Sequence, residues 1–240
     1  MCIVTLERII PYNKGQKIFR KEFWLDFFWY TIFQSYVLSV VISLLIEFID
    51  NSTQFSKYQL LSSWPVWLQV VFFVVTHDLY IYLFHKWQHR NKYLWRLHEA
   101  HHSPKEVDWI AGSRSHAIEI FINQTIEFLP LVLLGAAPEV AIYKGVISAV
   151  WGMWIHANVD VHSRQLQKVI NGPEMHRWHH STGKGRNRNF ATKFAFWDWG
   201  FGTAYLPAEK CEEYGLKTFF PSNYFLQLAY AFRRFKRAKR

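Results

Sequence analysis

Four long stretches of the chain carry almost no charged residues, and their length predicts helices that cross a membrane. The first, residues 27–46, contains no Asp, Glu, Lys or Arg. Twenty residues of α-helix rise about 30 Å, which matches the hydrocarbon core of a bilayer. The other three, of which the last two are weaker candidates, are residues 64–84 with His77 and Asp78, residues 120–137 with Glu127, and residues 140–155 with Lys144. The pattern predicts an all-α protein built on a four-helix transmembrane bundle.

A short turn separates the third and fourth stretches. Its sequence, GAAPE, contains Gly135 and Pro138, which favour a tight connection between antiparallel helices that either span the membrane or re-enter it. We expect no amino-terminal signal peptide, because the first apolar run begins too late and is too long to be a cleaved segment.

Lysine and arginine residues gather on one side of this predicted bundle. Of the 28, all but Lys57 and Lys144 precede the first helix, lie between the second and third, or follow the fourth. Basic residues concentrate on the cytoplasmic side of membrane proteins, so we expect four passes with both termini cytoplasmic, in a bacterial inner membrane or the endoplasmic reticulum. The carboxy-terminal YAFRRFKRAKR, part of a basic tail over 222–240, fits either an amphipathic helix on anionic headgroups or a solvated tail.

Composition narrows the class of protein and of metal site. A net charge of +10 suits nucleic acid, an anionic membrane or an acidic partner, but nucleic-acid binding leaves the apolar stretches unexplained, and we expect none. Cys2 and Cys211 lie at opposite ends of the chain, which argues against a disulfide framework or a thiolate metal site. Any metal is then held by nitrogen and oxygen, and we expect residues 1–240 to form one domain.

All twelve histidines lie between residues 77 and 180. On a helix, residues three and four apart share a face, so several of these histidines form short strips that point one way. The strips are His85 and His89 in HKWQH; His98, His101 and His102 in HEAHH; His176, His179 and His180 in HRWHH; and His156 in WIHANVD.

Metal binding explains why so many imidazoles share this spacing. Packing does not require imidazole at such positions, and burying many rings is costly unless a metal uses their lone pairs. One H-x-x-H-H triplet cannot surround two ions. The repeated motif therefore suggests two metal ions held side by side.

Polar residues close to the strips are candidates for supporting roles. Asp160 shares a helical face with His156. Asp78 and Tyr82 lie on nearly the same face as His85, and Asp78 either orients a ligand histidine from behind or is a hydrogen-bond partner at a helix end.

The remaining histidines fit the ligand spacing less well. His77, His116 and His162 are expected to support the site, face the substrate or lie at the surface, and His116 in GSRSHAIE is expected to act with Arg114 and Glu119. The later segment GKGRNRNF is basic and glycine-rich. It suits a loop near headgroups, a docking surface for an acidic electron donor, or a solvated loop.

These motifs together resemble the fatty acid hydroxylase and sterol desaturase superfamily of integral-membrane diiron enzymes. The resemblance covers residues 77–207, through HDLYIYLFHKWQH, LHEAHHS, GSRSHAIE, HANV, PEMHRWHHS and NRNFATKFAFWDWGFGTAYLP in the family's order. Asn189 and Asp198 match these blocks, and we assign them structural roles.

The resemblance implies a four-helix stalk under a cytosolic helical cap in which histidines bind two irons; zinc in their place is expected in some recombinant material. The implied ligands are His85, His89, His98, His101, His102, His156, His176, His179 and His180. Some members have a second histidine four residues after the position of His156, where this chain has Asp160. Whether Asp160 or His162 completes the metal shell stays open.

The implied activity is hydroxylation or desaturation of a lipid, such as a fatty acyl chain or a sterol, with O2. The chain has no fused cytochrome-type HPGG segment, so the electrons are expected from a separate cytochrome b5-like or ferredoxin-like protein. Aromatic residues either line the path of the lipid or pack in the core or the membrane interface; they are Trp151, Trp154, Phe194, Phe196 and Trp197. The alternative is a membrane zinc-binding protein without redox chemistry.

Overall fold

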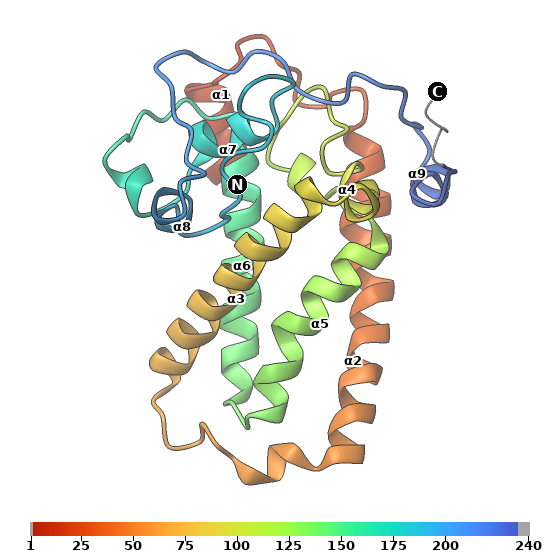
Figure 1. Cartoon of the computed structure of the whole chain (residues 1–240), viewed down its shortest axis with the longest axis vertical. Coiled ribbons are helices and arrows are strands. Elements are labelled where there is room, and N and C mark those ends of the chain that lie inside the picture. Colours follow the sequence, from red (N-terminus) through yellow and green to blue (C-terminus); the bar gives the residue numbers. More distant parts are fainter. Residues whose placement is uncertain (1, 235–240) are drawn as a thin grey trace.

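The computed structural model describes residues 2–234, which form helices and loops with two isolated β-bridges. Four long helices make a stalk, and the short helices and most loops make a cap at one end of it (Figure 1). The all-α expectation is confirmed. The α-helices are α1 (Cys2–Ile9), α2 (Ser35–Thr53), α3 (Val66–Arg90), α4 (Lys92–His98), α5 (Ala117–Leu133), α6 (Pro138–His156), α7 (Pro173–His179), α8 (Phe196–Gly200) and α9 (Tyr224–Tyr230), with η1 (Leu25–Gln34), η2 (Phe55–Tyr58), η3 (Ala111–Ser113) and η4 (Leu166–Lys168) between them.

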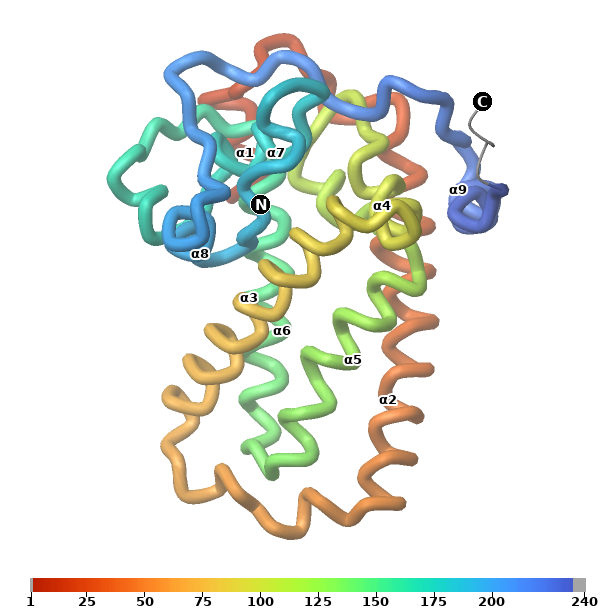
Figure 2. The backbone as a smooth tube through the Cα atoms, in the orientation of Figure 1, coloured from red at the N-terminus to blue at the C-terminus, as the bar shows by residue number. Residues whose placement is uncertain are grey.

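The stalk consists of α2, α3, α5 and α6, and the helices α1 and α9 both lie at its cap end (Figure 2). Among the described residues, two helical segments are long and apolar enough to cross a membrane: Leu25–Thr53 and Val66–Arg90. The first contains the predicted stretch 27–46, and the second begins two residues inside the predicted stretch 64–84. The third and fourth stretches coincide with α5 and α6, which run beside them without meeting that criterion.

Large apolar side chains are exposed along the outside of the stalk. A surface of this kind is unusual for a protein in water and typical of one that contacts lipid. Examples are Leu44, Phe48, Trp67, Val71, Ile142 and Val146.

The two charged residues within the third and fourth stretches pair with each other. Lys144 Nζ donates to Glu127 Oε1 over 2.5 Å, and Ser148 donates to the same oxygen over 2.7 Å. Pairing reduces the cost of placing either charge in an apolar surrounding. The charges that weakened these two predictions thus join α5 to α6.

The turn predicted between α5 and α6 is present at the end of the stalk away from the cap. Gly135 has a φ of +67°, and a Cβ there would lie 2.8 Å from the Cα of Gln59, so both conformation and space require glycine. Pro138 is the first residue of α6, where its missing N–H costs nothing.

The first stalk helix begins with ten π-helical residues, η1, and continues as α2. Such a long π-helix is rare. It buries Asp26, Tyr30 and Gln34, which are spaced four apart and all bond to residues of the cap. The π-helix thereby fastens the stalk to the cap.

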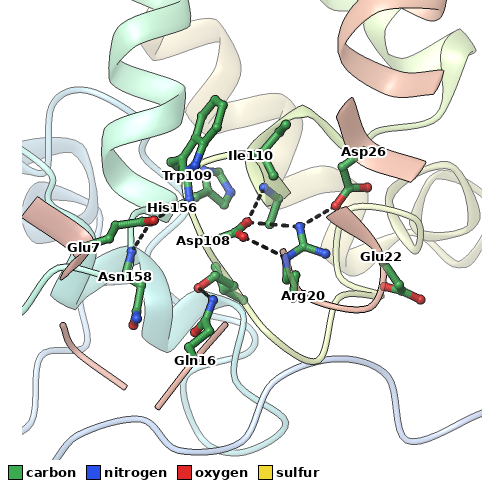
Figure 3. Close-up of polar contacts among 12 residues, drawn as sticks. Glu7, Gln16, Arg20, Glu22, Asp26, Asp108, Trp109, Ile110, His156 and Asn158 are labelled. Atoms are coloured by element: carbon green, nitrogen blue, oxygen red, sulfur yellow. Dashed lines mark hydrogen bonds and ion pairs between the residues drawn. The ribbon is translucent and has the colours of Figure 1, made fainter. Parts of the chain in front are cut away.

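Polar side chains of the amino-terminal segment anchor the loops of the cap (Figure 3). Arg20 donates to both oxygens of Asp108 over 3.0 Å and also pairs with Asp26. Glu7 accepts from the backbone N–H groups of Trp109 and Asn158. These contacts hold the two loops that follow the histidine-bearing ends of α4 and α6.

The segment YAFRRFKRAKR, expected to form either a basic amphipathic helix or a solvated tail, is described as far as Arg234, and its residues 231–234 form a turn and loop. The helix α9 ends at Tyr230, before the basic residues of that segment. Residues 235–240 lie outside the described part of the chain.

Candidate metal centre

Nine histidines converge where the stalk meets the cap. They come from the cap ends of α3 and α6, from α4 and the turn after it, and from α7 and the residue that follows it. All nine were selected from the sequence as implied ligands. One group is His85, His89, His98, His102 and His179, the other is His101, His156, His176 and His180, and within each group the candidate ligand atoms lie within 4.8 Å of one another.

The two groups adjoin and divide both triplets between them. The ring of His102 lies 4.6 Å from those of His179 and His180, and the ring of His98 lies 5.0 Å from that of His101. Neighbouring histidines in the sequence thus serve different groups. The H-x-x-H-H motif occurs twice because each copy contributes to both.

The second group places three ring nitrogens at the corners of a triangle. The Nε2 atoms of His156, His176 and His180 are 3.1, 3.1 and 3.2 Å apart, and that of His101 lies 3.3 Å from His156 Nε2. Nitrogens bound about 2.0–2.1 Å from one metal ion lie roughly 3 Å apart. The spacing therefore fits one shared ion.

Oxygen acceptors behind the rings fix the orientation of six histidines. A carbonyl or carboxylate oxygen can only accept, so the facing Nδ1 carries the hydrogen and the lone pair of the neutral ring lies on Nε2. The pairs are His85 with Phe190 O (2.8 Å), His89 with Asn187 Oδ1 (3.2 Å), His98 with Glu119 Oε1 (2.8 Å), His101 with Arg114 O (3.0 Å), His156 with Gly152 O (2.7 Å) and His179 with Arg188 O (2.7 Å).

These lone pairs face one another with no hydrogen between them. The Nε2 atoms of His85 and His98 are 2.9 Å apart, and both belong to rings whose Nδ1 is already donating. The buried Nε2 atoms of His89, His102 and His179 have no hydrogen-bond partner. Buried polar atoms are rarely left unpaired, so the residues fit a pair of cations that would accept all these lone pairs.

Burial keeps the cap histidines neutral and available as ligands. It lowers the pKa of His98, His102, His176, His179 and His180 well below the usual 6.5, and neighbouring histidines lower it further, because a charged ring beside another is unfavourable. Only neutral imidazole can coordinate a metal.

The stability of the metal-free protein should fall as the solution becomes acidic. Below about pH 6.5 the histidines of the unfolded chain take up protons while the buried ones do not, so the free energy of unfolding drops by up to about 1.4 kcal/mol per pH unit for each such group. Thermal unfolding in detergent between about pH 7.5 and 5 measures this slope. A midpoint unchanged across that range would contradict the neutral, buried state of these rings.

The loop over residues 187–190 supplies three of the six acceptors. Asn189 adopts a left-handed conformation with a φ of 56°, and its side chain bonds to Met175 O, Tyr205 O and Tyr205 N. Asp198 accepts from the N–H groups of Phe190 and Ala191 over 2.8 Å. The two residues assigned structural roles thus hold this loop against the histidines.

Replacing Asn189 with alanine should destabilise the protein. The substitution removes three hydrogen bonds, and alanine tolerates the left-handed conformation less well than asparagine, so we expect a loss of about 2–4 kcal/mol. The Asn189→Gly variant tolerates the conformation but lacks the hydrogen bonds, so it should lose less. Chemical unfolding of both variants measures the difference, and equal losses would show that the conformation contributes nothing.

Asp78 and Tyr82, two expected supporting residues on α3, hydrogen-bond to loop residues and not to the candidate ligand histidines. Asp78 accepts from Thr192 Oγ1 and from the N–H groups of Lys193 and Phe194 at 2.6–2.9 Å, and none of its described hydrogen bonds reaches a histidine. Tyr82 is fully buried and its hydroxyl lies 2.9 Å from Thr203 Oγ1. Both fix the segment that follows Phe190.

The other two expected supporting residues lie outside both groups. His116 begins α5, where its Nδ1 accepts from the N–H of Ile118 and its Nε2 donates to Leu228 O. Asp160 pairs with Lys210 and His162 at 2.6 and 3.0 Å, and the side chain of His162 is 55% exposed.

The structure gives Glu119 and Arg114 other histidine partners than the sequence predicted. Glu119, expected to act with His116, instead accepts from His98, and Arg114 serves His101 through its backbone carbonyl. Glu119 could be selected from the sequence because it lies in the motif GSRSHAIE. The backbone carbonyl oxygens of Arg114 and Phe190 could not be selected in this way, because every residue has a backbone carbonyl.

The aromatic residues proposed to line a lipid path pack against one another. The rings of Phe194 and Phe196 stack at 5.3 Å, and those of Phe196 and Trp197 lie 4.4 Å apart. Trp197 also packs on the core formed by Tyr82 and Phe190. This favours the packing role for these three residues.

Comparison with known proteins agrees with this geometry. The fatty acid hydroxylase family model matches residues 70–203, which include all nine histidines. Ornithine lipid hydroxylase OlsE of Rhizobium tropici is 34% identical over 145 residues, 60% of this chain and 44% of that protein. Human alkylglycerol monooxygenase is 31% identical over 144 residues, 58% of this chain and 31% of that protein.

A third relative is methylsterol monooxygenase 1-3 of Arabidopsis thaliana, 28% identical over 147 residues, 56% of this chain and 47% of that protein. In each case the match spans less than half of the relative's length. No solved structure matches the chain. The family model nevertheless covers more than half of the chain and all of its clustered histidines, and the chain belongs to the fatty acid hydroxylase family.

Proposed function

We propose that this protein is a membrane-bound non-haem diiron oxygenase that hydroxylates a lipid. The observation that carries the proposal is the convergence of nine imidazoles into two adjoining groups at the junction of an apolar stalk and a polar cap. The names of the relatives favour hydroxylation over desaturation, because they describe one hydroxylase and two monooxygenases, all acting on lipids.

Iron fits the donor set, although imidazole also binds zinc, copper and nickel. Two bound irons would supply the activation of dioxygen that attack on an unactivated C–H bond requires, a task beyond acid–base side chains. The chain's own contribution is to present Nε2 lone pairs at fixed positions. Oxygen acceptors behind the rings hold them there, as in other metal sites.

Apolar side chains keep water from the first group. The ring of Phe190 lies 5.2–5.8 Å from those of His85, His89 and His179, and Phe190 is 1% exposed. A dry surrounding strengthens electrostatic interactions and limits side reactions of an oxidant. Phe190 thus orients His85 by its carbonyl and shields three rings by its side chain.

The overall reaction requires electrons from outside the chain. One lipid C–H bond, one O2, two electrons and two protons give one alcohol and one water. We propose that a separate one-electron donor protein supplies the electrons, because the described side chains at the site are imidazoles, which do not supply them.

We further propose that all four stalk helices cross the membrane, with the cap and both termini in the cytoplasm. The one-sided distribution of lysine and arginine supports this orientation. The exposed apolar side chains on α2, α3 and α6 support contact with lipid on several sides.

Anaerobic purification after growth with added iron tests the function. We expect two irons per chain and, with 18O2 and a chemical or protein reductant, one labelled oxygen atom in a lipid hydroxyl group. Lipidomics of cells with and without the gene identifies which lipid to supply. Stoichiometric zinc, with no labelled lipid under any reductant, would contradict the proposal and support a metal-binding protein without redox chemistry.

A further inference from the structure

The histidine groups are closed to the surface except at one residue. Eight of the nine histidines are buried, and only His89 is partly exposed. His89 lies at the cap end of α3, where its Nδ1 faces the exposed side chain of Asn187. Any partner protein that exchanges electrons with this centre comes nearest to it at His89.

A surface hollow of about 440 Å³ leads to His89. The indole of Trp95, which also lines it, has its ring centre 4.9 Å from that of His89 and 5.2 Å from that of His102. The guanidinium of Arg186 lies 4.6 Å from the centre of the Trp95 ring. Trp95 therefore lines the hollow beside the partly exposed His89 and also contacts the buried His102.

Positive charge surrounds this hollow. It adjoins a second hollow of about 610 Å³, and the two share Trp95, Arg96, Glu99, Arg186 and Arg233. The one carboxylate, Glu99, pairs with Arg233 at 2.8 Å. We call the cationic lining residues the basic rim; they are Arg90, Lys92, Arg96, Arg186, Lys217, Arg233 and Arg234.

We propose that the basic rim is the docking surface for an acidic one-electron donor protein, and that electrons enter through Trp95 to His89 and His102. This inference rests on the proposed function. A rim of seven cations attracts and orients a negatively charged surface over several ångströms. The rim surrounds His89, which is the one partly exposed histidine among the nine described. A site that bound only a lipid headgroup would not need to lie beside a histidine of the metal centre.

Reversing charge on the rim should weaken docking. The probe is an acidic [2Fe–2S] ferredoxin, and the protein is held in nanodiscs of neutral phosphatidylcholine, which do not compete for cations. We expect the double variant Arg90→Glu/Arg186→Glu to raise the Kd at least about tenfold at low salt, and high salt to remove the difference by screening. Arg186→Lys retains the charge and should bind almost as the parent does.

The control is Lys168→Glu, which reverses one charge at an exposed lysine of η4, outside both hollows, and is compared with the single variant Arg90→Glu. It should change the Kd less than about twofold, since it alters net charge but not the rim. An equal loss for Lys168→Glu, or no loss for the double variant, would overturn the proposal. So would a double variant that binds ferredoxin normally but loses binding to anionic vesicles, because the rim would then be a membrane surface.

The route through Trp95 has its own readout. The protein is loaded with ferric iron, which accepts the electron, kept free of oxygen, and used at a concentration that saturates binding, so that a change in Kd does not affect the rate. Pre-reduced ferredoxin should then lose its visible-spectrum signature of the reduced cluster more slowly with Trp95→Leu than with the parent. Trp95→Phe, which keeps an aromatic ring, should be intermediate. Equal rates for all three proteins would exclude this route.

Binding is measured without any lipid substrate, so it separates this inference from the proposed function. Tight, rim-dependent binding of ferredoxin without lipid hydroxylation would support the docking surface and contradict the proposed oxygenase function. Lipid hydroxylation that does not change when the rim is mutated would support the oxygenase function and contradict the docking surface.

Discussion

Removing one histidine from either group should abolish lipid hydroxylation. We expect His179→Ala, in the first group, and His101→Ala, in the second, each to lower activity more than about 100-fold, because even residues behind metal ligands contribute 10–100-fold. The reason is that the two groups adjoin, with His102 within 4.6 Å of both His179 and His180, and that both are needed for one O2 in the proposed function. Losing one ion should disable the pair.

Metal content distinguishes loss of an ion from loss of the fold. By elemental analysis, each variant should bind about one fewer iron per chain, or bind it more weakly, since each group serves one ion. The second group keeps its triangle of His156, His176 and His180 without His101. The first group keeps four histidines without His179, so we expect His179→Ala to retain more of its weaker-bound metal than His101→Ala.

The matched control is His162→Ala. His162 is 55% exposed and pairs with Asp160 and Glu174, outside both groups. We expect this variant to keep most of its activity and both irons. Damage equal to that of His179→Ala would show that the fourth strip, from His156 to His162, contributes a ligand beyond the nine.

The helical spacing of the histidines could be predicted from the sequence because it is local. Residues three and four apart on a helix share a face whatever the rest of the chain does, and this holds for HKWQH, which lies on α3. For HEAHH the expectation of one helical strip is wrong, because α4 ends at His98 and both His101 and His102 lie in the turn after it. The assignment of His98 and His102 to one group and of His101 to the other could not be predicted from the sequence. It depends on how α4, α6 and α7 pack, which spacing along one helix does not encode.

The contrast between local pattern and helix packing also applies to the four predicted membrane-spanning stretches. Residues 27–46 and 64–84 could be recognised by length and composition alone. The first lies within a helical segment that is long and apolar enough to cross a membrane, and the second overlaps another from Val66 onward. Glu127 and Lys144 weakened the other two stretches because each was considered by itself. Their ion pair joins positions on different helices, and such a contact becomes visible only when both helices are placed.

The most informative single residue behind the ligands is Glu119, which is 4% exposed and accepts from His98 Nδ1 over 2.8 Å. We expect Glu119→Ala to weaken metal binding by the first group about 10–100-fold, as removal of such a partner does at other sites. Without the acceptor, the His98 ring can rotate or move its hydrogen to Nε2, which would point a proton at the metal position.

The Glu119→Gln variant separates hydrogen bonding from charge, because its amide oxygen can still accept from His98. If orientation matters most, Glu119→Gln should retain most of its iron while Glu119→Ala loses it from the first group; if the negative charge matters most, both should lose it. The control, Glu139→Gln, changes an exposed glutamate at the far end of α6 and should leave iron content unchanged. Full iron in Glu119→Ala, measured by chelator competition, would show that His98 is held without this carboxylate.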